Sequence, residues 1–156
     1  MNNEPAAAAE TYILFEVAGT TYAVRSNDVQ QLEMIEHITP VPNASEAVEG
    51  VVFSRGKVIP ALNLRTRFGF PKIAYDLRAR LVVVRVEGRG IGLIADSARE
   101  FKRIPAAALS PPSEALSGTT GKYLEAIATL ENRLILLLNL AEVVKTAEEI
   151  ESETQN

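Results

Sequence analysis

The stretch that decides the fold reads Glu49-Gly50-Val51-Val52-Phe53-Ser54-Arg55-Gly56-Lys57-Val58-Ile59-Pro60-Ala61-Leu62-Asn63-Leu64-Arg65. Two runs rich in apolar and β-branched residues, 51–54 and 57–62, are separated only by Arg55-Gly56. Two residues are the shortest common connection between antiparallel strands, and the glycine supplies the positive φ that such a turn needs. The stretch therefore predicts a tight β-hairpin that holds Arg55 out at its tip.

The tip of this hairpin is better suited to protein contact than to catalysis. A guanidinium on a rigid turn, with apolar strands on either side, is typical of an interface, although a lone Arg55 would more often be a solvated turn residue. Strand alternation places either Phe53 or Ser54 outward, and an exposed Phe53 would add an apolar contact. The hairpin is therefore the first candidate interaction site.

The rest of the chain repeats this style. Three further hairpins are predicted, joining residues 12–17 to 20–25, 81–86 to 91–95 and 123–130 to 133–138. Asn63 is placed to cap a short helix over 64–68, and Asn139 to cap a terminal helix whose apolar residues extend from Leu140 to Ile150 with a period of 3.6. Many short β segments with one C-terminal helix predict a mainly β protein built of small barrels or a sandwich.

Length and composition indicate one domain. With 156 residues and 47% hydrophobic content, the chain can bury a sizeable core. We expect a flexible leader over 1–10, a single domain over 11–148 with a subdomain boundary near 70–80 across which strands can exchange, and an acidic flexible tail over 149–156. No apolar run approaches the ~20 residues that span a bilayer, so direct membrane insertion is not expected.

Several functions are disfavoured by what the chain lacks. It contains no cysteine and a single histidine, His37, so thiolate chemistry and a histidine-based relay or zinc site have no companions. No catalytic residue, metal site or cofactor is therefore predicted. A net charge of −4, with 16 basic residues spread along the chain, argues against nucleic acid. A β-barrel enzyme or a binder of oligosaccharides or nucleotides remains an alternative, disfavoured by the 6% aromatic content.

The ordered set of motifs resembles the CheW family, the coupling proteins of bacterial chemotaxis. In that family a Gly-Val-x-x-x-Arg-Gly-x-x-(Ile/Val)-Pro pattern leads into Asp-Leu-Arg, which here reads Gly50 to Pro60 followed by Asn63-Leu64-Arg65. Further matching segments are Gly19-Thr-Thr-Tyr-Ala-Val24, Ile91-Gly-Leu-Ile-Ala-Asp96, Tyr123-Leu124 and Arg133 to Leu140. The resemblance covers residues 11 to 146. It implies two five-stranded SH3-like β-barrel subdomains, one mostly from each half of the chain, packed about a hydrophobic seam.

The resemblance also implies a function. Members of the family are adaptors without catalysis that join methyl-accepting chemotaxis receptors to a CheA-type histidine kinase, through the CheW-like regulatory domain of the kinase. Such a protein is cytoplasmic and is recruited to receptor arrays at the inner face of the membrane. Residues matching the family's receptor-binding surface are Val29, Gln31, Gly50, Arg55 and Gly56, with Phe53 as a possible partner contact. Val29 has a second interpretation, as the buried anchor of a short helical turn.

The chain departs from the family pattern at several positions. Gln31 stands where the family usually has glutamate, Phe53-Ser54 replaces Asn-Leu, Asn63 replaces aspartate and Ala126 replaces a common glycine. Loss of the carboxylate at position 31 removes a charge from the receptor-facing surface. These changes leave an alternative open: an accessory paralogue that binds only receptor or only kinase and tunes the array or serves a non-flagellar motility pathway.

Overall fold

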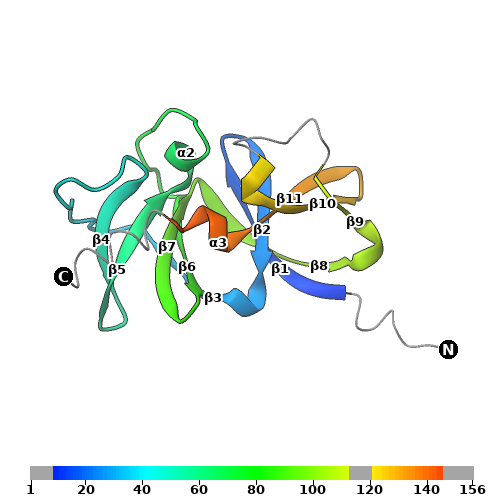
Figure 1. The fold of residues 1–156 in the computed structure, drawn as a ribbon, viewed down its shortest axis with the longest axis horizontal. Coiled ribbons are helices and arrows are strands. Elements are labelled where there is room, and N and C mark those ends of the chain that lie inside the picture. Colours follow the sequence, from blue (N-terminus) through cyan, green and yellow to red (C-terminus); the bar gives the residue numbers. More distant parts are fainter. Residues whose placement is uncertain (1–8, 113–120, 146–156) are drawn as a thin grey trace.

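The computed structural model describes residues 9–112 and 121–145, whose strands form two sheets that lie side by side (Figure 1). The sheet on the right of Figure 1 has the order β8-β1-β2-β11-β10-β9 and contains β1 (Ala9–Val17), β2 (Thr20–Arg25), β8 (Ser97–Pro105), β9 (Leu109–Ser110), β10 (Leu124–Leu130) and β11 (Arg133–Leu138). The sheet on the left has the order β3-β6-β7-β5-β4 and contains β3 (Val29–Met34), β4 (Val48–Ser54), β5 (Lys57–Asn63), β6 (Arg80–Val86) and β7 (Arg89–Ala95). Two short helices, α2 (Leu64–Arg67) and α3 (Leu140–Val143), follow β5 and β11. The predicted mainly β fold is confirmed.

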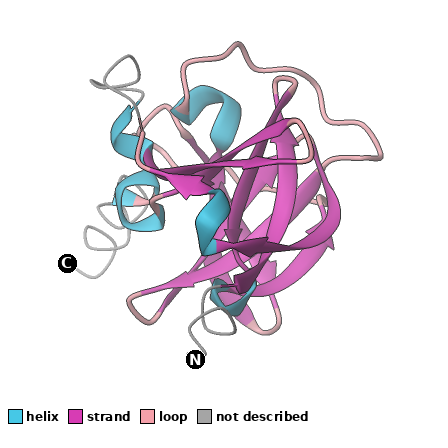
Figure 2. Cartoon of the chain, turned by 90° about the vertical axis from the view of Figure 1, so that its right-hand side faces the viewer, coloured by secondary structure: helices cyan, strands magenta, loops and turns pink. Residues whose placement is uncertain are grey.

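Both sheets are built on one plan. Each is antiparallel except for one parallel pair, β5 with β7 in one sheet and β11 with β2 in the other. Each of the strands β5 and β11 then leads into a short helix capped by an asparagine. The Asn63 side chain accepts a hydrogen bond from Thr66 N, and the Asn139 side chain accepts one from Glu142 N. The strands are strongly twisted and curved in both sheets (Figure 2). This curvature fits the two SH3-like subdomains that the resemblance implies.

The sheets depart from the expectation in two details. A sixth strand is present because β9 pairs with β10, whereas the corresponding edge of the other sheet has only the isolated bridge between Thr39 and Val51. The halves of the chain also do not form one sheet each: residues 29–95 contain all five strands of one sheet, and the other combines both ends of the chain.

The subdomain boundary is therefore not near 70–80. Those residues connect β5 to β6 within a single sheet. The connection is long because β7 lies between β5 and β6 in the sheet. The chain passes between the sheets at the 3₁₀ turn Ser26–Asp28 and again at Asp96.

The ends of the domain also differ from the prediction. The leader was expected to reach residue 10, but β1 already begins at Ala9. The acidic tail expected over 149–156 lies outside the described residues, as does the continuation of the terminal helix beyond Lys145.

Three apolar clusters hold the structure together. The largest lies between the two sheets and receives Ile13, Phe15 and Val17 from one face of β1. The opposite face of β1 sends Tyr12 and Leu14 into a second cluster inside the six-stranded sheet. A third cluster fills the five-stranded sheet with Ile59, Ala61, Leu81, Val83 and Ile94. Because β1 is apolar on both faces, it forms the wall between the seam and one barrel interior.

At three of the four register shifts among the described strands, the extra residue is a glutamine or a glutamate. Pairing shifts by one residue at Gln30 in β3, Glu49 in β4 and Glu125 in β10. A bulge re-aims the side chain of the extra residue. The partners that these side chains reach are Arg85 for Gln30, Lys72 for Glu49 and Arg25 for Glu125.

Candidate protein-interaction site

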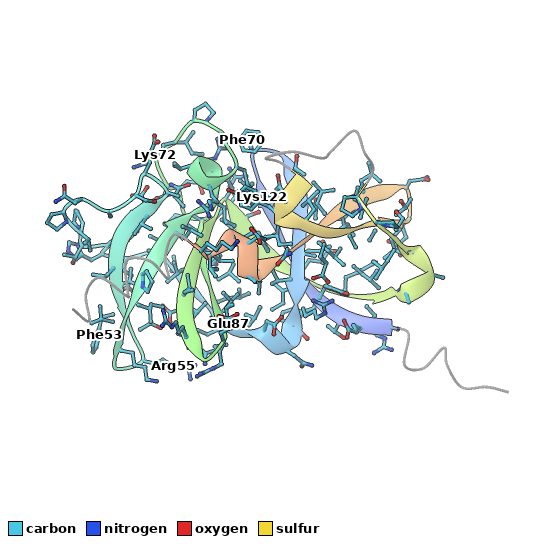
Figure 3. The ribbon with its side chains drawn as sticks, in the orientation of Figure 1. Phe53, Arg55, Phe70, Lys72, Glu87 and Lys122 are labelled. Atoms are coloured by element: carbon cyan, nitrogen blue, oxygen red, sulfur yellow. The ribbon has the colours of Figure 1, made fainter. Side chains whose placement is uncertain are left out.

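The β4–β5 hairpin has the geometry that its sequence predicts. Ser54 pairs with Lys57, and the two turn residues Arg55 and Gly56 have φ values of 49° and 81°. Positive φ at both positions is typical of the type I′ turn, whose twist matches that of the strands it joins. Arg55 is exposed at the tip, as expected (Figure 3).

Phe53 and Ser54 face opposite ways, as alternation requires. Ser54 is buried, whereas the Phe53 side chain is 74% exposed. Val58 lies directly across the hairpin from Phe53 and is 64% exposed. The outward face of the hairpin therefore carries an apolar pair that the fold does not use.

Ser54 belongs to a small polar network that bridges two sheet edges. β3 and β4 are the edges of the five-stranded sheet. Across the gap between them, the Gln31 amide donates to both the Glu33 carboxylate and the Ser54 hydroxyl, and Ser54 Oγ donates to Glu33 Oε2 at 2.7 Å. Side chains thus link edges whose backbones do not pair. Gln31 Oε1 is buried and has no hydrogen-bond partner within the described part of the chain.

A polar pocket of about 390 Å³ opens beside this network. Gln31 and Arg55 line it, together with Gln30, Lys57 and Arg85. The Arg85 guanidinium is held by its neighbours. Its Nη1 donates to Gly88 O at 3.2 Å. With the Gln30 amide in the flipped orientation, which satisfies its hydrogen bonding, the amide oxygen accepts from Nε at 3.1 Å and from Nη2 at 2.8 Å. The pocket is therefore lined by three cations, two of them on the β4–β5 hairpin.

An apolar groove of about 680 Å³ adjoins the hairpin as well. Phe53 and Val58 line it together with Met34, which is 53% exposed. Glu33 and His37 add polar groups to its lining. Large exposed apolar side chains gathered in a groove are typical of an interaction surface.

Four of the predicted site residues lie at the surface of the protein, at one or other of these two hollows. Gln31, Arg55 and Gly56 lie at the polar pocket or on the turn beside it, and Phe53 lies in the apolar groove. Figure 3 places Phe53 and Arg55 at the same end of the five-stranded sheet, with Glu87 of the β6–β7 turn beside them. These residues are brought together because the β4–β5 and β6–β7 hairpins end on the same side.

Val29 and Gly50 lie beneath the surface. Val29 is half-buried and packs against the seam between the sheets. It caps the 3₁₀ turn Ser26–Asp28, donating its backbone N–H to Ser26 O, and it also opens β3. Gly50 is buried, with φ of 154°, and a Cβ there would lie 2.1 Å from the carbonyl oxygen of Thr39. Two backbone hydrogen bonds join Thr39 to Val51 at 2.8 and 2.9 Å. Gly50 is therefore required for the close approach of two backbones.

The sequence did not single out Lys57, Arg85 or Gln30. Arg85 and Gln30 meet only because β3 pairs with β6 and a bulge displaces Gln30. Neither the pairing nor the bulge has a local signature. Lys57 could have been identified as a second cation beside the turn, since it follows Gly56 directly.

A second polar cluster holds the loop between β5 and β6 against the five-stranded sheet. Glu49 Oε1 accepts from Lys72 Nζ at 2.8 Å and from Asn63 Nδ2 at 2.9 Å, while Asn63 also donates to the Tyr75 hydroxyl. Burial by itself would raise the pKa of the Glu49 carboxyl, but the hydrogen bonds from Lys72 and Asn63 outweigh it and lower that pKa. Burial and the Glu49 charge both raise the pKa of Tyr75.

Neither a metal-binding cluster nor a membrane-spanning helix is present among the described residues. No three acidic or histidine side chains in 9–112 and 121–145 gather closely enough to hold a metal ion. None of the helices in these ranges has the length and apolar content to cross a membrane.

Comparison with known proteins identifies the family. Residues 11–148 match the family model described as CheW-like domain. The chain is 27% identical to the chemotaxis protein CheW of Bacillus subtilis over 83% of each chain, and 27% identical to protein FrzA of Myxococcus xanthus over 88% of this chain and 87% of that one. The crystal structure of the scaffolding protein TtCheW from Thermoanaerobacter tengcongensis superposes with a TM-score of 0.82 at 27% identity, covering 87% of this chain and 92% of that one. The chain therefore belongs to the family of CheW-like domain proteins, the coupling scaffolds of chemotaxis and motility signalling.

Proposed function

We propose that this protein is a non-catalytic adaptor that holds a methyl-accepting chemotaxis receptor and a CheA-type histidine kinase in a fixed relation. One observation carries the proposal: a single rigid hairpin, β4–β5, contributes to both a polar, basic pocket and an exposed apolar groove. Two surfaces of different chemistry on one element can bind two different partners at once.

The polar pocket is proposed as the receptor side. Arg55 and Gln31 line it, and Gly56 lies in the turn beside them. Val29 and Gly50 would act from behind, since Val29 packs the start of β3 onto the core and Gly50 allows the segment at Thr39 to pair with β4. Only Arg55, Gln31 and Gly56 would touch the receptor, whereas Val29 and Gly50 would support them from below.

The apolar groove is proposed as the kinase side. Phe53, Val58 and Met34 supply apolar area that a folded partner domain could cover. The groove lies between β3 and β4, the two edges of the sheet. The resemblance supplies the partner, because the regulatory domain of the kinase is itself CheW-like.

The mechanism would be geometric. An adaptor contributes no chemistry, but it fixes where kinase and receptor lie relative to each other. A change between two receptor states can then change kinase activity through differential contacts. Its place in the cell would be at receptor arrays on the inner face of the membrane.

Co-sedimentation tests the proposal. The protein is mixed with receptor cytoplasmic fragments and with the host's CheA-type kinase, each alone and then together, while kinase autophosphorylation is followed. Binding to both, with kinase activity made dependent on receptor, is the expected result. Binding to neither partner would contradict the proposal.

A second candidate function is an accessory paralogue that binds one partner only. Its support is the exposed Phe53 and the uncharged Gln31–Ser54 pair, both departures from the family pattern. The similarity to FrzA is compatible with a motility pathway. In the co-sedimentation experiment, binding to a single partner would favour this candidate over the first.

A further inference from the structure

We infer that the polar pocket selects a partner segment that carries carboxylates, and that Lys57 and Arg85 act with Arg55 as its specificity-determining residues. The inference rests on the proposed function, because it assumes that this segment belongs to the receptor. It adds the chemistry of the segment and two residues that the family motif does not include.

The first support is the charge of the pocket. Arg55, Lys57 and Arg85 line it, and no acidic side chain does so among the residues described. The chain as a whole has a net charge of −4, so this pocket is a local exception to an acidic protein. A positive pocket attracts a negatively charged partner and disfavours a positive one.

Two carboxylates on neighbouring segments, Glu33 and Glu87, lie outside the lining of this pocket. Glu33 is engaged by Gln31 and Ser54 and lines the apolar groove, not the polar pocket. Glu87 is exposed at the neighbouring turn and is not part of the pocket lining. At position 31 an amide replaces the carboxylate usual in the family, which removes a charge that would oppose an acidic ligand.

The second support is the orientation of Arg85. Its guanidinium is held by two neutral acceptors, the Gln30 amide oxygen and the Gly88 carbonyl. A guanidinium fixed by neutral groups keeps its full positive charge, and its planar fork suits a carboxylate. The bulge at Gln30 makes this arrangement possible.

Charge reversal at matched positions tests the inference. Affinity for the receptor cytoplasmic fragment is measured by isothermal titration calorimetry at low and high salt for the wild type, Lys57→Glu, Arg85→Glu and Arg85→Lys. Arg103→Glu is the control, because Arg103 is exposed on β8 of the other sheet and its reversal changes the net charge equally. Circular dichroism and thermal unfolding confirm that each variant folds.

We expect Lys57→Glu and Arg85→Glu each to weaken receptor binding about tenfold, and Arg103→Glu to change it by less than about twofold. Arg85→Lys keeps the charge but loses the planar fork, so its affinity should fall between those of the wild type and Arg85→Glu. Salt should weaken wild-type binding more steeply than binding by the reversed variants. Receptor binding unchanged by both reversals, or weakened equally by Arg103→Glu, overturns the inference and leaves the proposed function standing.

Failure of the wild type to bind receptor would instead overturn the proposed function. The pocket is then tested with a synthetic hexaglutamate peptide, followed by amide chemical shifts. Chemical shift changes at Arg55, Lys57 and Arg85 that disappear in the double variant K57E/R85E would show that the pocket binds acidic segments, in this case of a protein other than the receptor. No shifts, or the same shifts with inorganic phosphate alone, would overturn the acidic-segment site.

Discussion

The Arg65 guanidinium binds the Asp96 carboxylate through three hydrogen bonds, from Nε to Oδ1 at 3.0 Å and to Oδ2 at 3.2 Å, and from Nη2 to Oδ2 at 2.9 Å. Asp96 lies where the chain crosses from β7 of one sheet to β8 of the other, and its Oδ2 also accepts from Ala18 N at 2.8 Å. One carboxylate therefore joins α2 of the five-stranded subdomain to the β1–β2 turn of the six-stranded one. A scaffold that acts by geometry needs such a joint to be fixed.

Asp96→Asn should loosen this joint. Loss of the charge leaves the partly buried Arg65 without its counter-ion, so we expect the free energy of unfolding to fall by about 1–2 kcal/mol. Urea unfolding measures the change. Asp76→Asn is the matched control, because Asp76 pairs with Arg78 at 2.9 Å on an exposed loop. A loss of stability no greater than that of the control would contradict the role of Asp96.

Gly50→Ala should destabilise the fold. The added Cβ would lie 2.1 Å from Thr39 O, so either β4 or the segment at Thr39 must move. We expect a loss of about 2 kcal/mol or more in unfolding free energy. Gly56→Ala is the comparison: φ is 81° but no atom lies within 4 Å of a new Cβ, so the cost should be only about 1 kcal/mol. Equal losses at the two positions would argue against a close approach at Gly50.

Arg55→Glu should leave the fold intact and weaken receptor binding. Arg55 is exposed at the turn tip and lines the polar pocket, so reversal of its charge should cost about tenfold in affinity without lowering the unfolding temperature. Pull-down and calorimetry with the receptor fragment measure the effect. Unchanged affinity in a well-folded variant would remove Arg55 from the receptor site.

Phe53→Ser should weaken kinase binding without lowering the stability of the fold. The side chain is 74% exposed, so its removal should leave thermal unfolding unchanged. Kinase affinity should fall about tenfold, as for an apolar anchor at an interface. Leu134→Ser serves as the control, since Leu134 is 65% exposed on the other sheet. If kinase binding tolerates Phe53→Ser as well as the control substitution, the groove is not the kinase site.

Glu49 should make stability sensitive to acid. Its folded-state pKa lies below the ordinary value of 4.5 because of Lys72 and Asn63, so its ionised form stabilises the fold above about pH 4.5. This stability is lost as the pH falls through the lowered pKa. Glu49→Gln should therefore lower the unfolding free energy by about 1 kcal/mol at pH 7, with the difference from wild type shrinking by pH 3. A difference that stays constant across this pH range would exclude ionisation of Glu49 as the cause.

Local signals in the sequence were sufficient for the hairpins. A two-residue turn and alternating apolar residues are adjacent in the chain, and the observed turn at Arg55-Gly56 has the positive φ that they predict. The cap at Asn63 and the exposure of Phe53 follow from the same short-range rules. The two-subdomain fold came from a resemblance that spans most of the chain and that the family model then supports.

Pairing between distant segments could not be predicted in this way. The composition near 70–80 suggested a boundary, yet those residues connect β5 to β6 within one sheet, where β7 lies between the two strands. Gly50 matched a receptor-binding motif, but its tight contact with Thr39 depends on a bridge between segments that no local rule joins.

The sequence by itself determined which segments are strands, where they turn and which family they resemble, because these depend on neighbours in the chain. Tertiary structure alone decided that the two chain ends share one sheet and that a bulge brings Gln30 to Arg85. It also decided that Asp96 joins the two subdomains. Each of these relationships depends on strand register, which is set by packing of side chains across the whole core and not by any single segment.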